Sequence, residues 1–328
     1  MKNFEVIFHN LLKCKISRKK FLKTGIFSLI LLSKGNPFAD ILKAFAKEEI
    51  SSGRVKSSTK GAHDLVVAKG QYPYIMTKEA IKAMGGMAKF VKKGSVVLIK
   101  PNIGWDRSVE QAANTNPEVV AALIDLSHEA GAKRVNVFDA SCNDAKRCYA
   151  NSGVQQKAKE HGANIFFPSS WNVVMAKFAH TSPMENWPVY REALECDTFI
   201  NVPILKHHGL TGLTLSMKNL MGVCSGNRGQ IHYGIGKKLV DITGFINPDL
   251  TVIDAYRVLL RHGPQGGDLA DVALKNTVIV GTDPTLSDAF ACTLMDVDPL
   301  SVSYIQEASQ RGFGSIDLAK ADILHINT

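Results

Sequence analysis

The pattern of apolar and polar positions after residue 61 predicts alternating strands and helices. Leu65–Ala68 and Ser95–Ile99 are apolar runs without polar alternation, which is typical of strands buried on both faces of a parallel sheet. Pro117 opens a segment of helical period that ends before Gly131. We therefore expect an α/β fold with a doubly wound, mostly parallel sheet and helices on both faces. Further strands are expected at 134–138, 164–167, 198–205, 249–253, 276–280 and 322–326, and further helices at 77–91, 154–161, 239–246, 285–295 and 301–310.

The stretch 201–222 combines this pattern with an unusual density of polar groups. The strand 198–205 runs into Lys206, His207 and His208, and a helical period is expected from about Leu210. On that helix Thr211, Thr214 and Lys218 would share one polar face. The stretch 169–191 has no clear period, and we expect an irregular excursion there.

Several other predicted strands also end in groups capable of chemistry. In open α/β sheets, ligands bind outside the carboxyl ends of the strands, where loops and helix N-termini converge. We therefore expect one crevice at that edge of the sheet, lined by Lys100, Asn102, Asp139, His207, Lys218, Asp254 and Asp283.

These residue types suggest roles for an enzyme that acts on a small anionic substrate. His207, Asp139 and Asp254 are candidates for moving protons; the cofactor is left open, with a divalent metal as the candidate because imidazole and carboxylate suit one. Lysine supplies point charges for carboxylate or phosphate. The candidate metal ligands are His207, His208 and Asp283, and the candidate substrate-binding residues are Lys100, Asn102, Lys206, Lys218 and Asn219.

Two other classes of function remain open. The same crevice could serve a non-catalytic protein that only binds a small anion, or the polar groups could form a structural network in an exported interaction protein. No dinucleotide fingerprint, P-loop or G-x-S-x-G motif occurs in the chain, so these enzyme classes have no support.

The net charge of +9 does not indicate a nucleic-acid partner. Residues 1–46 contain nine of the 39 basic residues and two of the 30 acidic ones, which leaves 30 basic and 28 acidic residues for the rest. The basic excess therefore belongs to the N-terminal segment.

That segment resembles a twin-arginine export signal. Ser17-Arg-Lys-Lys20 is followed by the apolar run Gly25–Leu32 and by Ala44-Phe-Ala46, an A-x-A cleavage pattern. The apolar run is too short to cross a bilayer, and Lys19 stands where a second Arg is expected. An ordinary Sec signal and an uncleaved amphipathic N-terminus are the alternatives. We expect a signal at 1–46, a linker at 47–61, a single α/β domain at 62–328, and a periplasmic or otherwise exported protein without a transmembrane segment in the mature chain.

Six segments in order resemble the family called domain of unknown function 362. They are Ile99–Asn102, Thr115–Pro117, Pro203–His207, Lys218–Gly222, His262–Gly267 and Thr282–Pro284 with the following Asp288. The resemblance extends over residues 62–300 and implies an α/β protein, often exported, with some members fused to a ferredoxin-like module that carries two iron–sulfur clusters. This chain lacks the C-x-x-C-x-x-C run of such a module, so a redox role would require a redox partner protein.

The cysteines give little support to a metal cluster. Five follow residue 46, and an odd number leaves at least one thiol unpaired in an exported protein. Cys142 and Cys148 are the candidates for a disulfide, whereas the spacing of Cys142, Cys148, Cys196 and Cys224 fits no known iron–sulfur ligation pattern.

The export hypothesis predicts cleavage after Ala46 and a mature protein outside the cytoplasm. The intact mass of the protein recovered from the cell envelope would show the new N-terminus. An unprocessed protein in the cytosol would contradict the hypothesis.

Overall fold

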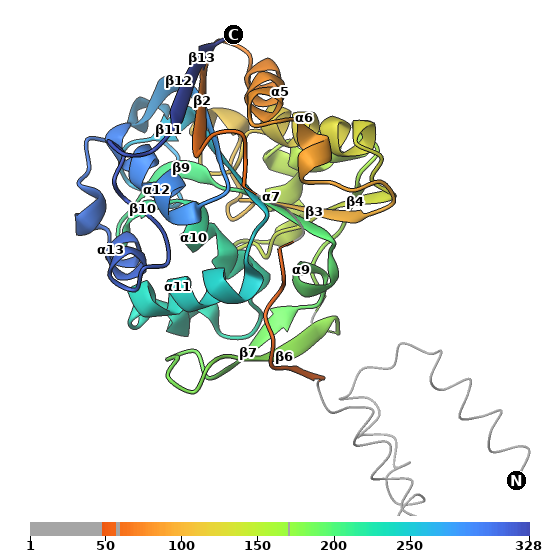
Figure 1. Cartoon of the computed structure of the whole chain (residues 1–328), viewed down its shortest axis with the longest axis vertical. Helices are drawn as coiled ribbons and strands as arrows, with labels where there is room; N and C mark the ends of the chain where they lie inside the picture. Colours follow the sequence, from red (N-terminus) through yellow and green to blue (C-terminus); the bar gives the residue numbers. More distant parts are fainter. Residues whose placement is uncertain (1–47, 57–59, 170) are drawn as a thin grey trace, which may run out of the picture. The chain divides into compact units, whose positions relative to one another are not determined.

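A large mixed sheet, mostly parallel, organises the folded part of the chain. The computed structural model describes residues 48–56, 60–169 and 171–328 (Figure 1). The predicted signal at 1–46 lies outside these residues. In the described part, the strand order is β13-β2-β12-β11-β8-β3-β4-β5, and β9 and β10 extend the sheet beside β11. The strands are β2 (Leu65–Lys69), β3 (Val96–Pro101), β4 (Arg134–Val137), β5 (Asn164–Ile165), β8 (Thr198–Val202), β9 (Ile204–His208), β10 (Gly212–Thr214), β11 (Leu250–Leu259), β12 (Val272–Gly281) and β13 (Ile323–Asn327).

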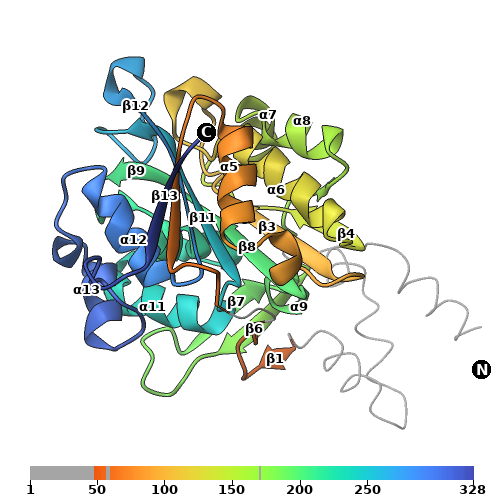
Figure 2. The same ribbon diagram turned by 45° about the horizontal axis from the view of Figure 1, so that its top comes forward.

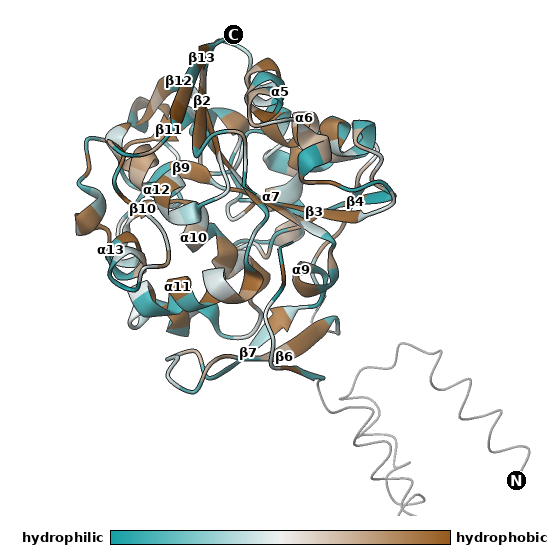
Figure 3. Cartoon of the chain, viewed as in Figure 1, coloured by the Kyte–Doolittle hydropathy of each residue, from teal (hydrophilic) through white to brown (hydrophobic). Residues whose placement is uncertain are grey.

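Helices cover both faces of this sheet, and the sheet lies between two hydrophobic cores (Figure 2). Successive residues of β3 alternate between them, because Leu98 joins one core while Val97 and Ile99 join the other. The strands are accordingly apolar along their length, whereas the helices show one apolar and one polar side (Figure 3). The predicted doubly wound α/β fold is confirmed. One face carries α5 (Pro73–Ala83), α6 (Pro117–Glu129), α7 (Ala145–Asn151) and α8 (Val154–Glu160), and the other carries α10 (Ser216–Asn219), α11 (Ile235–Ile246), α12 (Pro284–Thr293) and α13 (Ser303–Gln310).

The direction of β12 departs from an all-parallel sheet. β12 pairs antiparallel with both β11 and β2, with Gly281 opposite Thr251. Its last residues therefore lie at the edge where β11 begins. A strand end predicted from sequence does not reveal which edge of the sheet it reaches.

The stretch 169–191 is more regular than the sequence indicates. β6 (Val173–Lys177) and β7 (Asn186–Tyr190) pair antiparallel, and β1 (Glu49–Ile50) adds a parallel third strand. The helix α9 (Glu192–Glu195) then leads into β8. The expectation of an irregular excursion is corrected, because long-range pairing supplies the order that the local pattern lacks.

The predicted linker at 47–61 is partly built into the domain. Arg54 is buried, forms an ion pair with Asp249, and donates a hydrogen bond of 2.9 Å to the carbonyl of Asn247. Lys56 Nζ donates to the carbonyl of Thr282 at 2.9 Å. The folded unit therefore begins at Glu49 and not at residue 62.

The stretch 201–222 also differs from its predicted form. The expected strand is divided at Pro203 into β8 and β9, and no helix begins at Leu210. Instead β10 folds back antiparallel on β9, with Thr214 opposite Lys206, and the short helix α10 begins only at Ser216. Thr214 and Lys218 consequently come from different elements.

None of the helices in the described residues is long and apolar enough to cross a membrane.

Replacing Arg54 tests whether the segment before residue 62 belongs to the folded unit. Arg54→Met would leave the Asp249 carboxylate buried without its cation, and we expect a loss of roughly 3–5 kcal/mol in unfolding free energy by denaturant titration. The control is Lys60→Met at the exposed Lys60–Asp64 pair, where the expected change stays below about 1 kcal/mol. A loss at Arg54→Met that also stays below about 1 kcal/mol would show that the Arg54–Asp249 pair contributes no stability.

Candidate functional site

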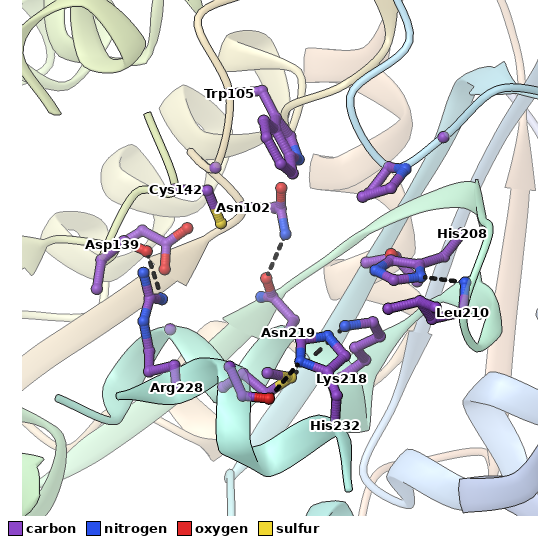
Figure 4. A pocket seen from close by; sticks show the side chains of 18 of the residues that line it. Asn102, Trp105, Asp139, Cys142, His208, Leu210, Lys218, Asn219, Arg228 and His232 are labelled. Carbon is purple, nitrogen blue, oxygen red and sulfur yellow. Dashed lines mark hydrogen bonds between the residues drawn. The ribbon is translucent and has the colours of Figure 1, made fainter. Parts of the chain in front are cut away.

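A cavity of about 570 Å³ lies where β3, β4 and β9 end (Figure 4). Its walls come from these strand ends, from α10, and from the segment that contains the 3-10 helix η4 (Arg228–His232). The chemically capable residues that line it are Lys100, Asn102, Trp105, Asp139, Cys142, Lys206, His208, Thr214, Lys218, Asn219, Arg228 and His232.

Lys100 and Asp139 form a buried ion pair at the base of this cavity. Lys100 Nζ lies 2.8 Å from Asp139 Oδ1 and donates a hydrogen bond of 3.0 Å to Asn219 Oδ1. Burial lowers the pKa of Lys100, and the Asp139 charge acts in the opposite direction. Asp139 Oδ2 accepts a hydrogen bond from the N–H of Ile103 at 2.7 Å. The charge of Lys100 is therefore already compensated within the protein.

Asn219 connects this ion pair to two neighbouring strands. Its Nδ2 donates to the carbonyl of Lys100 at 3.1 Å and to Asn201 Oδ1 at 2.8 Å. Asn102 Nδ2 in turn donates to Asn219 Oδ1 at 3.0 Å. Among the predicted substrate-binding residues, Asn219 thus mainly fixes the position of α10 against the sheet.

Lys206 lines the same cavity without a carboxylate partner among the described residues. Its Nζ donates to the carbonyl of Ala113 at 2.5 Å and to Asn102 Oδ1 at 3.3 Å. Burial lowers its pKa to about 7, and the positive charges of Lys218 and Lys100 act in the same direction.

Lys218 is the least compensated of the three lysines. Its side chain projects from α10 and is 8% exposed, and its Nζ contacts the Met221 thioether at 3.5 Å. Within the described residues it takes part in no ion pair. Burial lowers its pKa to about 8, and the Arg228 charge adds to this effect.

Asp288 holds the helix that carries Lys218. It lies on α12, and its two carboxylate oxygens accept hydrogen bonds from the N–H groups of Ser216 at 2.8 Å and Met217 at 3.2 Å. Burial raises the pKa of Asp288 to about 7. The acidic residue that follows the Thr282–Pro284 segment therefore has a positioning role at the start of α10.

The two adjacent histidines point in opposite directions, as successive residues of a strand must. His208 lines the cavity, and its ring lies 6.1 Å from that of His232. Burial lowers the pKa of His208 to about 3, and the charges of Lys218 and Lys206 contribute. The N–H of Leu210 donates to His208 Nδ1 at 3.1 Å, which places the proton of the neutral ring on Nε2.

His207 is directed away from the cavity. Its Nδ1 accepts the N–H of Gly263 at 3.1 Å. The expected position of His207 in the crevice is therefore corrected: His208 takes that position.

Asp254 and Asp283 lie outside the cavity as well. Asp254 is buried within β11, accepts the N–H of Asn116 at 2.8 Å, and has its pKa raised by burial to about 6. Asp283 lies at the opposite edge of the sheet because β12 is antiparallel, and it caps α12 by accepting the N–H of Thr285 at 2.8 Å. Both carboxylates accept hydrogen bonds from backbone N–H groups at helix starts. Only some of the residues that were expected to line a single crevice therefore line this cavity.

The predicted metal ligands are not brought together. His207 points away from the cavity that His208 lines, and Asp283 lies at the opposite edge of the sheet. In the described residues, no group of three His, Cys, Asp or Glu side chains could hold a metal ion. Cys142 and Cys148 are both free thiols, so the disulfide considered for them is not formed. The residues present do not form a site for the divalent metal that the sequence suggested.

Four lining residues were given no role in the site by the sequence analysis, although it placed Thr214 on one polar face with Lys218. Arg228 donates to the carbonyls of Ala140 at 2.7 Å and Ser141 at 2.8 Å. Thr214 Oγ1 is buried and has no hydrogen-bond partner within the part of the chain that the structure describes. His232 and Trp105 complete the walls. Arg228, His232 and Trp105 lie in loops or short elements without periodicity, so no local signal marks them.

Gly222 allows the backbone to approach the ion pair, and its replacement tests that pair. A Cβ at this position would overlap Asp139 Oδ1 and lie 2.6 Å from Lys100 Nζ. We expect Gly222→Ala to lower the unfolding free energy by about 3 kcal/mol or more, since the buried pair must separate. The control is Gly104→Ala in the same cavity, where the nearest atom is 3.5 Å away and the expected change is within about 0.5 kcal/mol. Similar denaturation midpoints for both variants would show that the close contact between Gly222 and the ion pair does not matter for stability.

Comparisons with known proteins place the chain in a family. A thylakoid-associated protein of Synechocystis sp., sll1697, is 28% identical over 232 residues, which cover 68% of this chain and 70% of that protein. A solved structure from Thermotoga maritima is similar with a TM-score of 0.43 and 15% identity over 68% of this chain. The lactate racemase apoprotein from Thermoanaerobacterium thermosaccharolyticum is similar with a TM-score of 0.40 and 13% identity over 76% of this chain. The alignments cover 59% and 61% of those two solved chains. Residues 97–293 match the family described as a domain of unknown function, DUF362, and because this match extends over more than half of the chain, the protein belongs to that family.

Proposed function

We propose that the cavity binds a small molecule that carries a carboxylate or phosphate group. The observation that carries this proposal is Lys218, a cation that is nearly buried, faces the cavity, and has no anionic partner among the described residues. Buried charges in proteins are normally paired or coordinated. A bound anion supplies the missing charge.

The balance of charge in the cavity supports the same conclusion. Four cationic side chains line it, and its one carboxylate, Asp139, is already paired with Lys100. The charge of Lys218 contributes to the lowered pKa of Lys206, so the two ammonium groups repel each other. Lys206 and Lys218 would therefore gain from an anion placed between them.

The remaining donors suit oxygen atoms of an anion. Thr214 offers a buried hydroxyl without a partner, and neutral His208 offers an Nε2–H. Hydrogen bonds from ionised donors to carboxylate or phosphate are roughly twice as strong as neutral ones. Trp105 adds an apolar wall for the uncharged part of the ligand.

An enzyme acting on this anion is the second candidate, and His208 favours it. An imidazole that stays neutral beside Lys218 and Lys206 can donate its Nε2–H to an oxygen of a bound substrate on which negative charge develops. Because an export signal is predicted at 1–46, we place this activity outside the cytoplasm in the proposal.

Isothermal titration calorimetry with phosphate, succinate and malonate tests anion binding. We expect Lys218→Met to weaken binding by about 10–100-fold, since a hydrogen bond to a charged group contributes roughly 1.5–3 kcal/mol. Lys218→Arg, which keeps the charge, should retain most of the affinity.

Affinity in the unmodified protein should fall as pH rises through the Lys206 and Lys218 pKa values of about 7 and 8, because the deprotonated amines no longer attract an anion.

The matched control is Lys100→Met. This change strands the Asp139 carboxylate and should lower the unfolding free energy by roughly 3–5 kcal/mol, whereas Lys218→Met should leave it unchanged or raise it. A stability loss at Lys218→Met equal to that at Lys100→Met, with anion affinity unaltered, would show that Lys218 is a structural residue.

A further inference from the structure

We propose that the Lys218 amine is a nucleophile that forms an imine with a carbonyl group of the small anionic ligand. The ligand class is then a 2-oxo acid or another anion that carries an aldehyde or ketone. This inference rests on the proposed anion site and adds a reaction to it.

The surroundings of Lys218 leave its nitrogen available. Its contact in the cavity is the Met221 thioether, a weak and uncharged acceptor, at 3.5 Å. Lys100, in contrast, is held by a carboxylate, an amide oxygen and a carbonyl, and Lys206 by an amide oxygen and a carbonyl. Of the three lysines that line the cavity, Lys218 therefore has the fewest interactions to lose when its nitrogen forms a new bond.

The charge state of Lys218 fits this role. Burial lowers its pKa to about 8, with the Arg228 charge contributing, so a substantial fraction of the amine is neutral near neutral pH. A lysine that is desolvated or placed beside another cation is a recognised form of activated nucleophile. Arg228, whose guanidinium stays charged, remains to hold the anionic group of the ligand while Lys218 reacts.

The step balances without any further reactant. The nitrogen lone pair forms a bond to the carbonyl carbon, and the C=O π electrons move to oxygen, which takes up a proton. The nitrogen gives up two protons in turn and the oxygen takes up two in all, so the C–O bond breaks and water leaves as the C=N bond forms. His208 Nε2–H and the Thr214 hydroxyl are the neutral donors that the cavity offers to the oxygen as its charge develops.

Borohydride trapping with the full-length protein tests the inference. Pyruvate or glyoxylate is added with sodium borohydride, and intact mass and peptide mapping locate the reduced adduct. We expect one adduct per chain, on Lys218, at least 10-fold faster with glyoxylate than with the uncharged acetaldehyde after correction for their intrinsic reactivities. The rate of adduct formation should rise with pH around 8 as Lys218 loses its proton.

Two variants separate this inference from the anion site itself. Lys218→Arg keeps the positive charge but cannot form an imine, so we expect retained phosphate binding with loss of the adduct. Lys206→Met should still form the adduct at Lys218. Phosphate binding in the unmodified protein without any adduct would overturn the imine and leave the anion site intact. An adduct on Lys206, or equal labelling of surface lysines, would also overturn the imine. Equal rates with charged and uncharged carbonyl compounds would instead contradict the proposed anion site.

Discussion

The buried ion pair between Lys100 and Asp139 is the interaction on which the arrangement of the cavity depends. It joins the end of β3 to the end of β4, and Asn219 ties the same pair to α10. Gly222 lies against both charges, where no side chain could fit. Two strands and a helix are therefore held at a fixed separation by one polar network, and buried networks of this kind are stable only when every member is satisfied.

The three lysines that line the cavity differ in the groups that compensate their charge. Lys100 has its counter-charge within the protein, whereas Lys206 relies on uncharged oxygen acceptors and Lys218 on a thioether. The uncompensated positive charge is thus concentrated on one side of the cavity, next to two histidines whose pKa values are lowered. The chain tolerates this unfavourable placement of charge, and that is the observation behind the proposed anion site.

The carboxylates around the sheet explain why the cavity stays positive. Asp254, Asp283 and Asp288 all accept N–H groups at helix starts, and none of them lines the cavity. Asp288 nevertheless influences the site, because it fixes the first residues of α10 and thereby the position of Lys218. These acidic residues thus hold backbone N–H groups in place, and the cations line the cavity.

The sequence by itself determined the α/β class, most strand and helix positions, and the presence of lysines at strand ends, because periodicity and strand-end chemistry are local properties. It could not decide that β12 runs antiparallel, which moves Asp283 to the other edge, or that β10 folds back on β9 where a helix was expected. It also could not choose between His207 and His208, since one residue of register decides which faces the cavity. Thr214 enters the site through the pairing of β10 with β9, and Arg228 through a loop that contacts residues distant in sequence. Only the tertiary structure could decide these points, because strand direction, register and loop placement are set by contacts between segments and not by the pattern within one segment.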